Sequence, residues 1–543
     1  MGMEQRKDRR EDAGMIAVSN LKLRPGEPES LLKQKAAKAL GIAPDRIESL
    51  AIRKKSLDAR RKPELWYIYT VGLTVAGNEE KLAARCRTAS VVHDIPYPIP
   101  HAQSCAERPV VIGFGPAGMF AALLLAKAGA RPIVLERGQD VDARCKAVEA
   151  FRAGGAFDPE SNVQFGEGGA GTFSDGKLNT GTHDKRIRWV LEQFAAHGAP
   201  EHIVYDAKPH IGTDVLVDVV RAIREDVIAL GGEVRFQNRV TGIEVKNGAL
   251  TTLTVTTPEG EQRLETGHAI LAIGHSARDT FRALHAAGVP MEPKPFSMGV
   301  RIEHRQEAID LAQYGRQRGD TLPSADYALN CRTEHGSAYT FCMCPGGEVF
   351  AAASETGGVV TNGMSRSKRD GENANAALLV TLHPEDFPGS GVFAGMEWQR
   401  EIEQAAFRYG GGNYRAPAQL VGDFLKNVPS TGPRSVQPTY RPGVTWGDVC
   451  AVLPEKITSV LREAIPALGR KLRGFDDPDA VLTAPETRSS SPVRIPRGED
   501  FCTACAEGLY PCGEGAGYAG GITSAAVDGM RCAEAVLKEL GAE

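Results

Sequence analysis

Three glycines stand close together at Gly113-x-Gly115-x-x-Gly118, with Pro116 and Ala117 between them. Gly113 permits a tight turn, Gly115 lets the backbone come close to a pyrophosphate, and Gly118 allows a helix to pack closely on a strand. The first turn of that helix would direct backbone N–H groups and the positive end of its dipole at the phosphates. The spacing therefore predicts a turn that binds the phosphates of a nucleotide.

The segments around this turn have the order that such a site needs. Residues 110–112 predict a buried strand, residues 119–130 a buried helix, and residues 132–135 a second strand. That strand ends at Glu136, which Arg137 follows. An acidic residue at this place accepts hydrogen bonds from the hydroxyls of an adenosine ribose. We therefore expect a dinucleotide-binding fold with both residues at the cofactor.

A second glycine-rich stretch covers residues 166–178. It matches the same glycine spacing, but no buried strand precedes it and no apolar helix follows it, so it does not predict a second site of this kind. Its glycines, hydroxyl groups and lysine suit a backbone that crosses over a bound phosphate or flavin. We expect four of its residues at the cofactor, namely Gly169, Thr172, Ser174 and Lys177.

Two later segments decide between a nicotinamide and a flavin dinucleotide. A strand from Val240 leads through a hairpin to an apolar strand at 269–274, which ends in Gly274. Near the end of the chain, a glycine-rich turn at 509–522 precedes an amphipathic helix at 523–540. FAD needs this second turn because its flavin half extends to another helix N-terminus, whose dipole can stabilise the reduced ring. The predicted cofactor residues therefore also include Val240, Gly274, Glu514, Gly520, Gly521 and Ile522.

Five motifs occur together in this chain: GFGPAG at 113–118, Glu136-Arg137, FGEGGAGTFSDGKL at 165–178, AIGH at 272–275 and YPCGEGAGYAGGI at 510–522. In this combination the chain resembles a bacterial family of FAD-dependent dehydrogenases, related to the glutathione-reductase-type flavoproteins with one dinucleotide fold and a separate substrate domain. The resemblance implies FAD as the cofactor. It also places Glu514 where related flavoproteins often carry an aspartate that faces the ribitol, and it implies no particular substrate.

Charge and proline content divide the chain into parts. Residues 1–100 hold 19 Lys and Arg against 13 Asp and Glu, a balance of +6, whereas the remainder holds 45 against 55, a balance of −10. The prolines between 96 and 100 predict an extended connection at this boundary. We expect an α/β protein of three parts: a small basic α+β domain at 1–100, a Rossmann-type FAD-binding domain at 105–285 completed by 487–543, and a mixed-sheet α+β substrate domain at 286–486.

The sequence exposes no catalytic acid or base. Arg301, Arg366 and Arg488 are candidates for binding an anionic substrate, because a guanidinium group binds a carboxylate or a phosphate through two donors. Each of them could instead be the partner in a structural ion pair. The cysteines of Cys502-x-x-Cys505 could be inert, a redox pair or half of a metal site. No second pair completes a zinc site, so we predict no bound metal.

We predict hydride transfer between flavin N5 and an unidentified small-molecule substrate, with an electron donor or acceptor such as NAD(P)H visiting the same fold. The alternative is an RNA-associated flavoprotein, in which the basic residues 53–62 form a strand connection that touches RNA. The acidic balance beyond residue 100 would repel a polyanion, so we predict that nucleic acid is not a partner.

The remaining sequence features concern the cellular compartment and membrane association. The first residues lack the apolar core of a secretory signal, and no apolar run approaches the roughly 18 residues of a membrane span. The 11 cysteines show no regular pairing, which favours a reducing compartment over a disulfide scaffold. We expect a cytoplasmic enzyme without a membrane partner.

Overall fold

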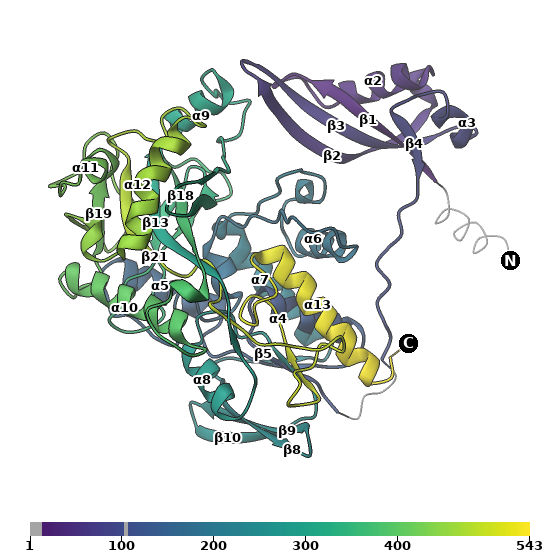
Figure 1. Ribbon diagram of the computed structural model, residues 1–543. Helices are drawn as coiled ribbons and strands as arrows, with labels where there is room; N and C mark the ends of the chain where they lie inside the picture. The colour runs from purple at the N-terminus through teal and green to yellow at the C-terminus, as the bar shows by residue number, and fades with distance from the viewer. Residues whose placement is uncertain (1–13, 103–106, 543) are drawn as a thin grey trace.

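The computed structural model describes residues 14–102 and 107–542. Three larger sheets organise this part of the chain: a four-stranded N-terminal sheet, a five-stranded parallel sheet and a seven-stranded mixed sheet. Figure 1 shows the N-terminal sheet as a separate unit at the top, joined to the rest by a long extended segment. The predicted fold class, α/β with a Rossmann-type unit, is confirmed.

The parallel sheet has the strand order β23-β11-β5-β6-β7, with β5 at its centre. All three residues of β5 are apolar and buried, as expected for a strand that other elements cover on both faces. The last strand of the chain, β23, pairs with β11, so the C-terminal segment returns to this sheet. The strands are β5 (Val110–Ile112), β6 (Ile133–Leu135), β7 (Glu233–Arg235), β11 (Ala269–Leu271) and β23 (Leu509–Pro511).

Two helices from distant parts of the sequence lie against each other beside this sheet (Figure 1). Helix α4 (Pro116–Lys127) begins at the first glycine turn, and α13 (Ile522–Glu539) begins at the last one. A Cβ atom on Gly529 would lie 2.0 Å from the carbonyl oxygen of Ala117, so the two backbones meet directly. The contact fixes the two helices to each other close to the start of α4.

The other elements of this unit surround the sheet. The segment 166–178 contains a short 3₁₀ helix, η2 (Gly169–Phe173), and no strand or α-helix, in agreement with its rejection as a second dinucleotide turn. A long helix, α7 (Thr213–Ala229), follows this loop later in the chain. The remaining elements are α5 (Val141–Arg152), α6 (Arg186–Ala196), η3 (Glu201–Val204), α8 (Arg278–Ala286) and an antiparallel sheet of β8 (Arg239–Lys246), β9 (Ala249–Thr257) and β10 (Gly260–Glu265).

The mixed sheet has the order β14-β15-β18-β13-β21-β19-β20, and only β19 and β20 run parallel. Strand β16 is not part of this sheet, because it pairs with β17 in a separate hairpin. The elements are β13 (Phe296–Arg305), β14 (Asn330–Arg332), β15 (Ser337–Cys344), β16 (Glu348–Ala351), β17 (Thr361–Met364), β18 (Asn373–Leu382), β19 (Ala416–Leu420), β20 (Val444–Trp446), β21 (Val481–Glu486), α9 (Gln306–Tyr314), α10 (Ala394–Tyr409), α11 (Val421–Lys426), α12 (Glu455–Gly469), η4 (Pro384–Asp386), η5 (Val449–Ala451) and the ribbon β12 (Glu292–Pro293) with β22 (Val493–Arg494).

The N-terminal sheet has the order β2-β3-β1-β4. The prediction that residues 53–62 connect two strands is wrong, because β2 runs through them to Arg61 and the turn is at Lys62-Pro63. The long basic side chains instead line a strand, and three of them pair with acids of the same unit: Arg53 with Asp94, Lys55 with Glu29 and Arg60 with Asp58. The elements are β1 (Met15–Leu23), α2 (Leu31–Leu40), η1 (Pro44–Arg46), β2 (Ile47–Arg61), β3 (Glu64–Val75), α3 (Glu79–Ala83) and β4 (Ala89–Val92).

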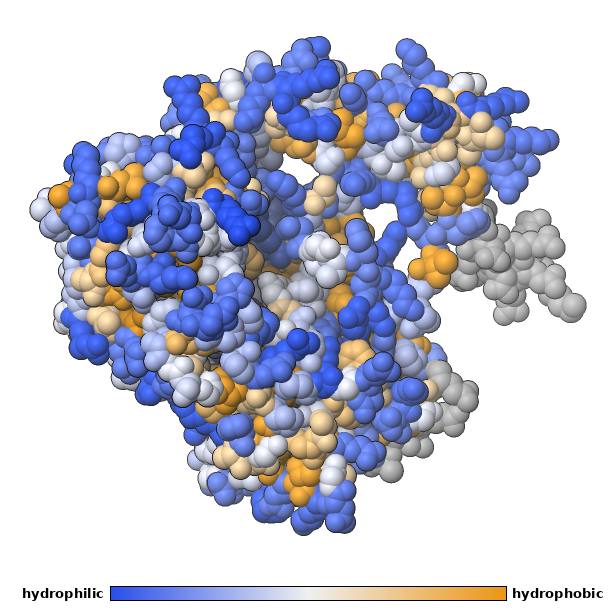
Figure 2. Space-filling model, in the orientation of Figure 1, coloured by the Kyte–Doolittle hydropathy of each residue, from blue (hydrophilic) through white to orange (hydrophobic). Residues whose placement is uncertain are grey.

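The β2–β3 hairpin also contacts the rest of the molecule. Leu65 is 5% exposed and belongs to the same apolar cluster as Tyr314 of α9. The backbone of Lys55 accepts a hydrogen bond from Ala207 and donates one to Tyr205, each 2.8–2.9 Å long. Figure 2 nevertheless shows open gaps between this unit and the body beneath it. Contact is therefore made mainly through the hairpin.

No helix in the described ranges is both long and apolar enough to cross a membrane.

Candidate functional site

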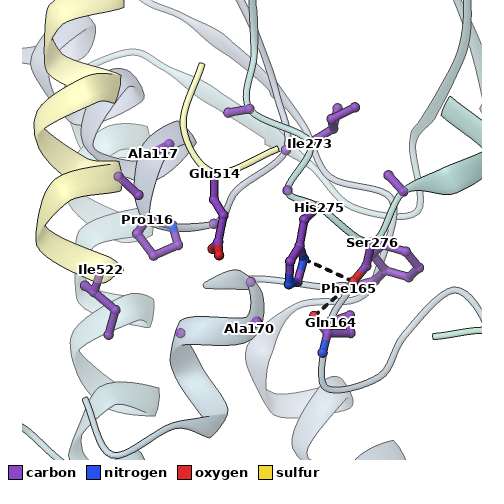
Figure 3. A pocket seen from close by; sticks show the side chains of 18 of the residues that line it. Pro116, Ala117, Gln164, Phe165, Ala170, Ile273, His275, Ser276, Glu514 and Ile522 are labelled. Atoms are coloured by element: carbon purple, nitrogen blue, oxygen red, sulfur yellow. Dashed lines mark hydrogen bonds between the residues drawn. The ribbon is translucent and has the colours of Figure 1, made fainter. Parts of the chain in front are cut away.

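A large cavity that opens to solvent lies between the parallel sheet and the mixed sheet. We call it the central cavity, and Figure 3 shows part of its wall. Of the residues predicted at the cofactor, all except Gly118 and Thr172 line it. They are Gly113, Gly115, Pro116, Ala117, Glu136, Arg137, Gly169, Ser174, Lys177, Val240, Gly274, Glu514, Gly520, Gly521 and Ile522. Residues scattered over more than 400 positions are thus brought to one surface by the fold.

The first glycine turn has the close approaches that its spacing predicts. Gly113 has a φ of +94°, and a Cβ there would lie 2.4 Å from the carbonyl oxygen of Ala272. A Cβ on Gly118 would lie 1.9 Å from the carbonyl oxygen of Gly113, which accounts for its place behind the cavity wall. At Gly115 a Cβ would meet only the Cα of Gly169, at 3.7 Å. The backbone of Gly115 therefore faces the open space in which a pyrophosphate can approach it.

Glu136 organises the loops around this turn. Its carboxylate is 5% exposed and accepts backbone N–H groups from Phe114 at 2.8 Å and from Gly138 and Gly166 at 2.9 Å. A carboxylate offers about four acceptor positions. One position remains for a ribose hydroxyl, so the predicted contact and this structural role are compatible.

Arg137 lines the cavity, but its guanidinium group is already engaged. It pairs with Glu160 at 3.0 Å and with Asp279 at 2.9 Å, and it lies 4.0 Å from the centre of the Phe165 ring. These contacts hold the side chain flat against the wall. Its predicted role at the cofactor stays a prediction.

The loop that contains η2 lies directly over the glycine turn. The N–H of Gly168 donates to the carbonyl of Phe114 at 2.8 Å, and a Cβ on Gly169 would lie 2.9 Å from the Cα of Gly115. Thr172 faces away from the cavity, because its hydroxyl donates to the carbonyl of Glu167 at 3.3 Å. The position of Thr172 therefore does not support its prediction as a cofactor residue, because its hydroxyl forms a hydrogen bond within the loop.

The C-terminal turn presents an open helix N-terminus and a carboxylate. A Cβ would find no atom within 4 Å at Gly520 and only the Ser524 hydroxyl, at 3.9 Å, at Gly521. In Figure 3 the carboxylate of Glu514 and the imidazole of His275 extend into the same space. Burial raises the pKa of the Glu514 carboxyl, and His275 and Lys294 oppose this rise. This arrangement is the one expected for a carboxylate that accepts hydrogen bonds from a polyol such as ribitol.

His275 lines the cavity, although the sequence analysis named it only within the AIGH motif and did not predict it at the cofactor. One of its ring nitrogens, Nε2, lies 2.7 Å from the carbonyl oxygen of Arg488, and Nδ1 lies 3.2 Å from the hydroxyl of Ser276. Ser276 in turn lies 3.2 Å from the side-chain oxygen of Gln164 (Figure 3). Because a carbonyl only accepts, Nε2 carries a hydrogen, whereas the single hydrogen of the Ser276 hydroxyl can be donated to only one of Nδ1 and the Gln164 oxygen. The signal in the sequence was its place directly after Gly274.

Two of the three arginines proposed for an anionic substrate do not reach the cavity. Arg301 is fully buried and pairs with Glu486 at 2.8 Å and 3.0 Å, so it is a structural ion-pair partner. Arg366 is exposed and lies outside the cavity wall, because the chain turns outward after β17. Both predictions as substrate ligands are wrong.

Arg488 lines the cavity, yet its guanidinium group serves a buried network. It donates to Glu403 at 2.9 Å and 2.8 Å, and Arg278 of α8 donates to the same carboxylate at 3.0 Å. Burial would raise the pKa of Glu403, but Arg278 and Arg488 lower it to about 2. The network ties α8 to α10 and to the strand end that carries Arg488.

The cysteine pair Cys502 and Cys505 lies outside the cavity wall. A role for it as a dithiol that acts directly on the cofactor has no geometric support. Cys512 does line the cavity and lies near Asp528 and Cys532. Arg497 already pairs with Asp528 at 2.6 Å, so this group is not a cation site open for a metal.

A protein of Clostridium beijerinckii, described only as uncharacterized, is 45% identical to this chain over 531 residues, or 96% of this chain and 99% of that protein. The chain belongs to the same family. Residues 295–489 match the family model described as FAD-dependent protein, C-terminal domain-like, and residues 15–74 match a domain of unknown function. FAD is therefore the cofactor of this protein, as the glycine motifs predicted.

Three solved structures illustrate the similarity of fold. The flavin-dependent brominase Bmp2 is 12% identical with a TM-score of 0.37, over 80% of this chain and 79% of that one. The p-nitrophenol 4-monooxygenase PnpA of Pseudomonas putida is 14% identical with a TM-score of 0.35, over 80% and 81%. A flavoprotein/dehydrogenase of Cytophaga hutchinsonii is 13% identical with a TM-score of 0.36, over 80% and 79%.

Proposed function

We propose that this protein is an FAD-dependent oxidoreductase that transfers a hydride between flavin N5 and a small-molecule substrate. The observation that carries the proposal is the continuity of the central cavity. One end is formed by the glycine turn, Glu136 and the start of α13, and the other by Phe341, Cys342 and Asn362 of the mixed sheet. A flavin bound along the first end would therefore expose its ring to a molecule held at the second.

The start of α13 supports the chemistry of a reduced flavin. Its first backbone N–H groups carry the positive end of the helix dipole and open into the cavity without a side chain at Gly520 or Gly521. Such a terminus stabilises negative charge that develops on the flavin pyrimidine when the ring takes up electrons. No catalytic acid or base is required for this step beyond correct positioning of the two reactants.

The described residues give little support to the RNA alternative. The basic strand residues Arg53, Lys55 and Arg60 each have an acidic partner within 3 Å. Charges neutralised within their own unit contribute less to the attraction of a polyanion. We therefore propose a small molecule as substrate and a visiting donor or acceptor such as NAD(P)H, with no nucleic acid partner.

The test begins with the protein purified without added cofactor. Its visible spectrum should show flavin bands, and heating should release FAD and not FMN. Anaerobic addition of NADH or NADPH should bleach the flavin, and a metabolite screen should then identify a compound that restores the oxidised spectrum. A protein that retains FAD but exchanges electrons with no donor, including dithionite, would refute the oxidoreductase proposal while leaving the cofactor assignment intact.

A further inference from the structure

One cation that reaches the substrate-domain wall of the central cavity has no acidic partner among the described residues. Lys177 extends from the η2 loop across the cavity, and its ammonium group donates to the carbonyl of Met343 on β15. Within the described part of the chain, no carboxylate oxygen lies within 4.0 Å of this ammonium group. Two of its three N–H donors therefore remain for a ligand.

The other charged groups at this wall are paired. Glu486 binds Arg301, Asp175 binds Arg369 at 2.9 Å, and Arg488 binds Glu403. The opposite charges of each pair largely cancel, so the pair contributes little net charge to the cavity. The net charge at this end thus comes from Lys177, whereas the unpaired carboxylate of Glu514 lies on the C-terminal turn.

Asn362 adds a second donor at the same wall. Its side-chain oxygen accepts from the Arg301 guanidinium at 2.9 Å and from the N–H of Gly363 at 2.8 Å. Because both neighbours only donate, the amide oxygen is fixed toward them and the NH₂ group is left for the cavity that Asn362 lines.

Cys342 lines the cavity beside both donors, because it directly precedes Met343 and its carbonyl binds the same Arg301 that binds Asn362. It is the exposed residue next to Phe341 on β15, it has a φ of +39°, and its carbonyl accepts from Arg301 at 2.9 Å. A left-handed backbone at a residue other than glycine is costly, so its surroundings must hold it in place. The thiol is thereby presented to the cavity.

We propose that Lys177 and Asn362, beside Cys342, form a subsite for a carboxylate or comparable oxyanion of the substrate. A compact ammonium charge and a planar amide donor suit an oxygen anion, and a buried site of this kind selects against a neutral analogue that leaves the donors unpaired. The inference rests on the proposed function only in naming the ligand as the substrate. In this proposal Lys177 and Asn362 take the role predicted for the three arginines, since Arg301 and Arg488 are paired with glutamates and Arg366 lies outside the cavity.

The test uses Cys342 as a reporter in the full-length, FAD-loaded protein. Iodoacetate and iodoacetamide have nearly the same size and form the same S–C bond with loss of iodide, but only iodoacetate is an anion. Rates of alkylation at Cys342 are measured by peptide mass spectrometry at mildly alkaline pH, because the protein around the cavity desolvates the thiolate and so raises the pKa of this thiol. Cys505, outside the cavity, serves as the reference within each sample.

The ratio of the iodoacetate rate to the iodoacetamide rate should be higher at Cys342 than at Cys505. Lys177→Met should lower the ratio at Cys342 by roughly five- to tenfold, because an attraction between unit charges is lost. Asn362→Asp, which keeps the acceptor for Arg301, should lower it as well. The matched control Lys368→Met removes an exposed lysine outside the cavity and should leave the ratio unchanged.

Equal ratios at the two cysteines, a ratio that Lys177→Met does not change, or a Cys342 that reacts with neither reagent would each overturn the subsite. FAD content and reduction by dithionite are measured on the same samples. If both are normal while the ratio fails, the subsite is wrong and the oxidoreductase proposal survives. If the flavin cannot be reduced, the proposed function fails, whatever the ratio.

Discussion

Glu403→Gln is the substitution for which the structure gives the sharpest expectation. The carboxylate is 1% exposed and accepts two hydrogen bonds from Arg278, two from Arg488 and one from the hydroxyl of Thr487 at 2.7 Å. An amide offers one acceptor oxygen, and its NH₂ group would face guanidinium donors. Two buried arginines would then share a neutral partner, with Glu355 left as an acid that contacts Arg278.

The magnitude follows from the pKa. Folding lowers the pKa of Glu403 from 4.5 to about 2, which corresponds to about 3 kcal/mol of stability. Removal of one partner from a buried ion pair costs a similar amount, about 3–5 kcal/mol. For a domain of the size of the substrate domain, we expect a fall in melting temperature of roughly 6–12 °C at pH 7.

The assay is thermal unfolding followed by circular dichroism and by release of flavin fluorescence. The control is Glu401→Gln, on the same helix α10 but exposed, which should change the melting temperature little. Because folding lowers this pKa, the stabilisation is fully present above pH 4.5 and is lost as the pH falls toward 2. The difference between wild type and variant should therefore shrink over that range. A variant as stable as the control at pH 7 would refute the argument.

Four further expectations concern the cofactor. Gly115→Val should leave the protein folded, since its Cβ would meet only Gly169, at 3.7 Å. It should abolish FAD retention, because the side chain would fill the space that the pyrophosphate occupies, and a variant that purifies with full FAD would contradict this. Gly521→Asp should either lose FAD or lower the reduction potential of the bound flavin, because a side chain there has room in the protein and its negative charge opposes reduced flavin. The potential is measured by dye equilibration, and an unchanged potential with full FAD occupancy would make the turn merely structural. Glu136→Gln should lower both the FAD content and the melting temperature, because one of three buried N–H donors loses its acceptor, which costs about 1–3 kcal/mol of folding free energy. The control is Glu149→Gln, on the exposed face of α5. A chain that begins at residue 104 should keep FAD, because its dinucleotide elements are complete. Its melting temperature should be lower, because the apolar cluster that contains Tyr314 loses Leu65. A colourless product would show that the N-terminal unit is needed for cofactor binding.

The sequence by itself determined the dinucleotide part of this protein. Glycine at 113, 115 and 118, a buried strand before them and an acid after the next strand are local features, and the backbone they specify depends on few distant contacts. The same holds for the turn before α13, whose glycines leave a helix N-terminus open. For this reason the residues predicted in these two turns line the cavity, apart from Gly118, and the cofactor could be identified before the fold was known.

Only the tertiary structure decided what the arginines do. Arg301 and Arg488 look alike in the sequence, yet each finds a glutamate far away in the chain, and Arg366 is left in solvent. Likewise, the basic residues 53–62 lie within a strand because β2 pairs with β3 along its length. A charged side chain can be free or paired according to whether a distant opposite charge is buried beside it. That depends on how the sheets are brought together, because burying a charge without a partner costs far more than any local preference.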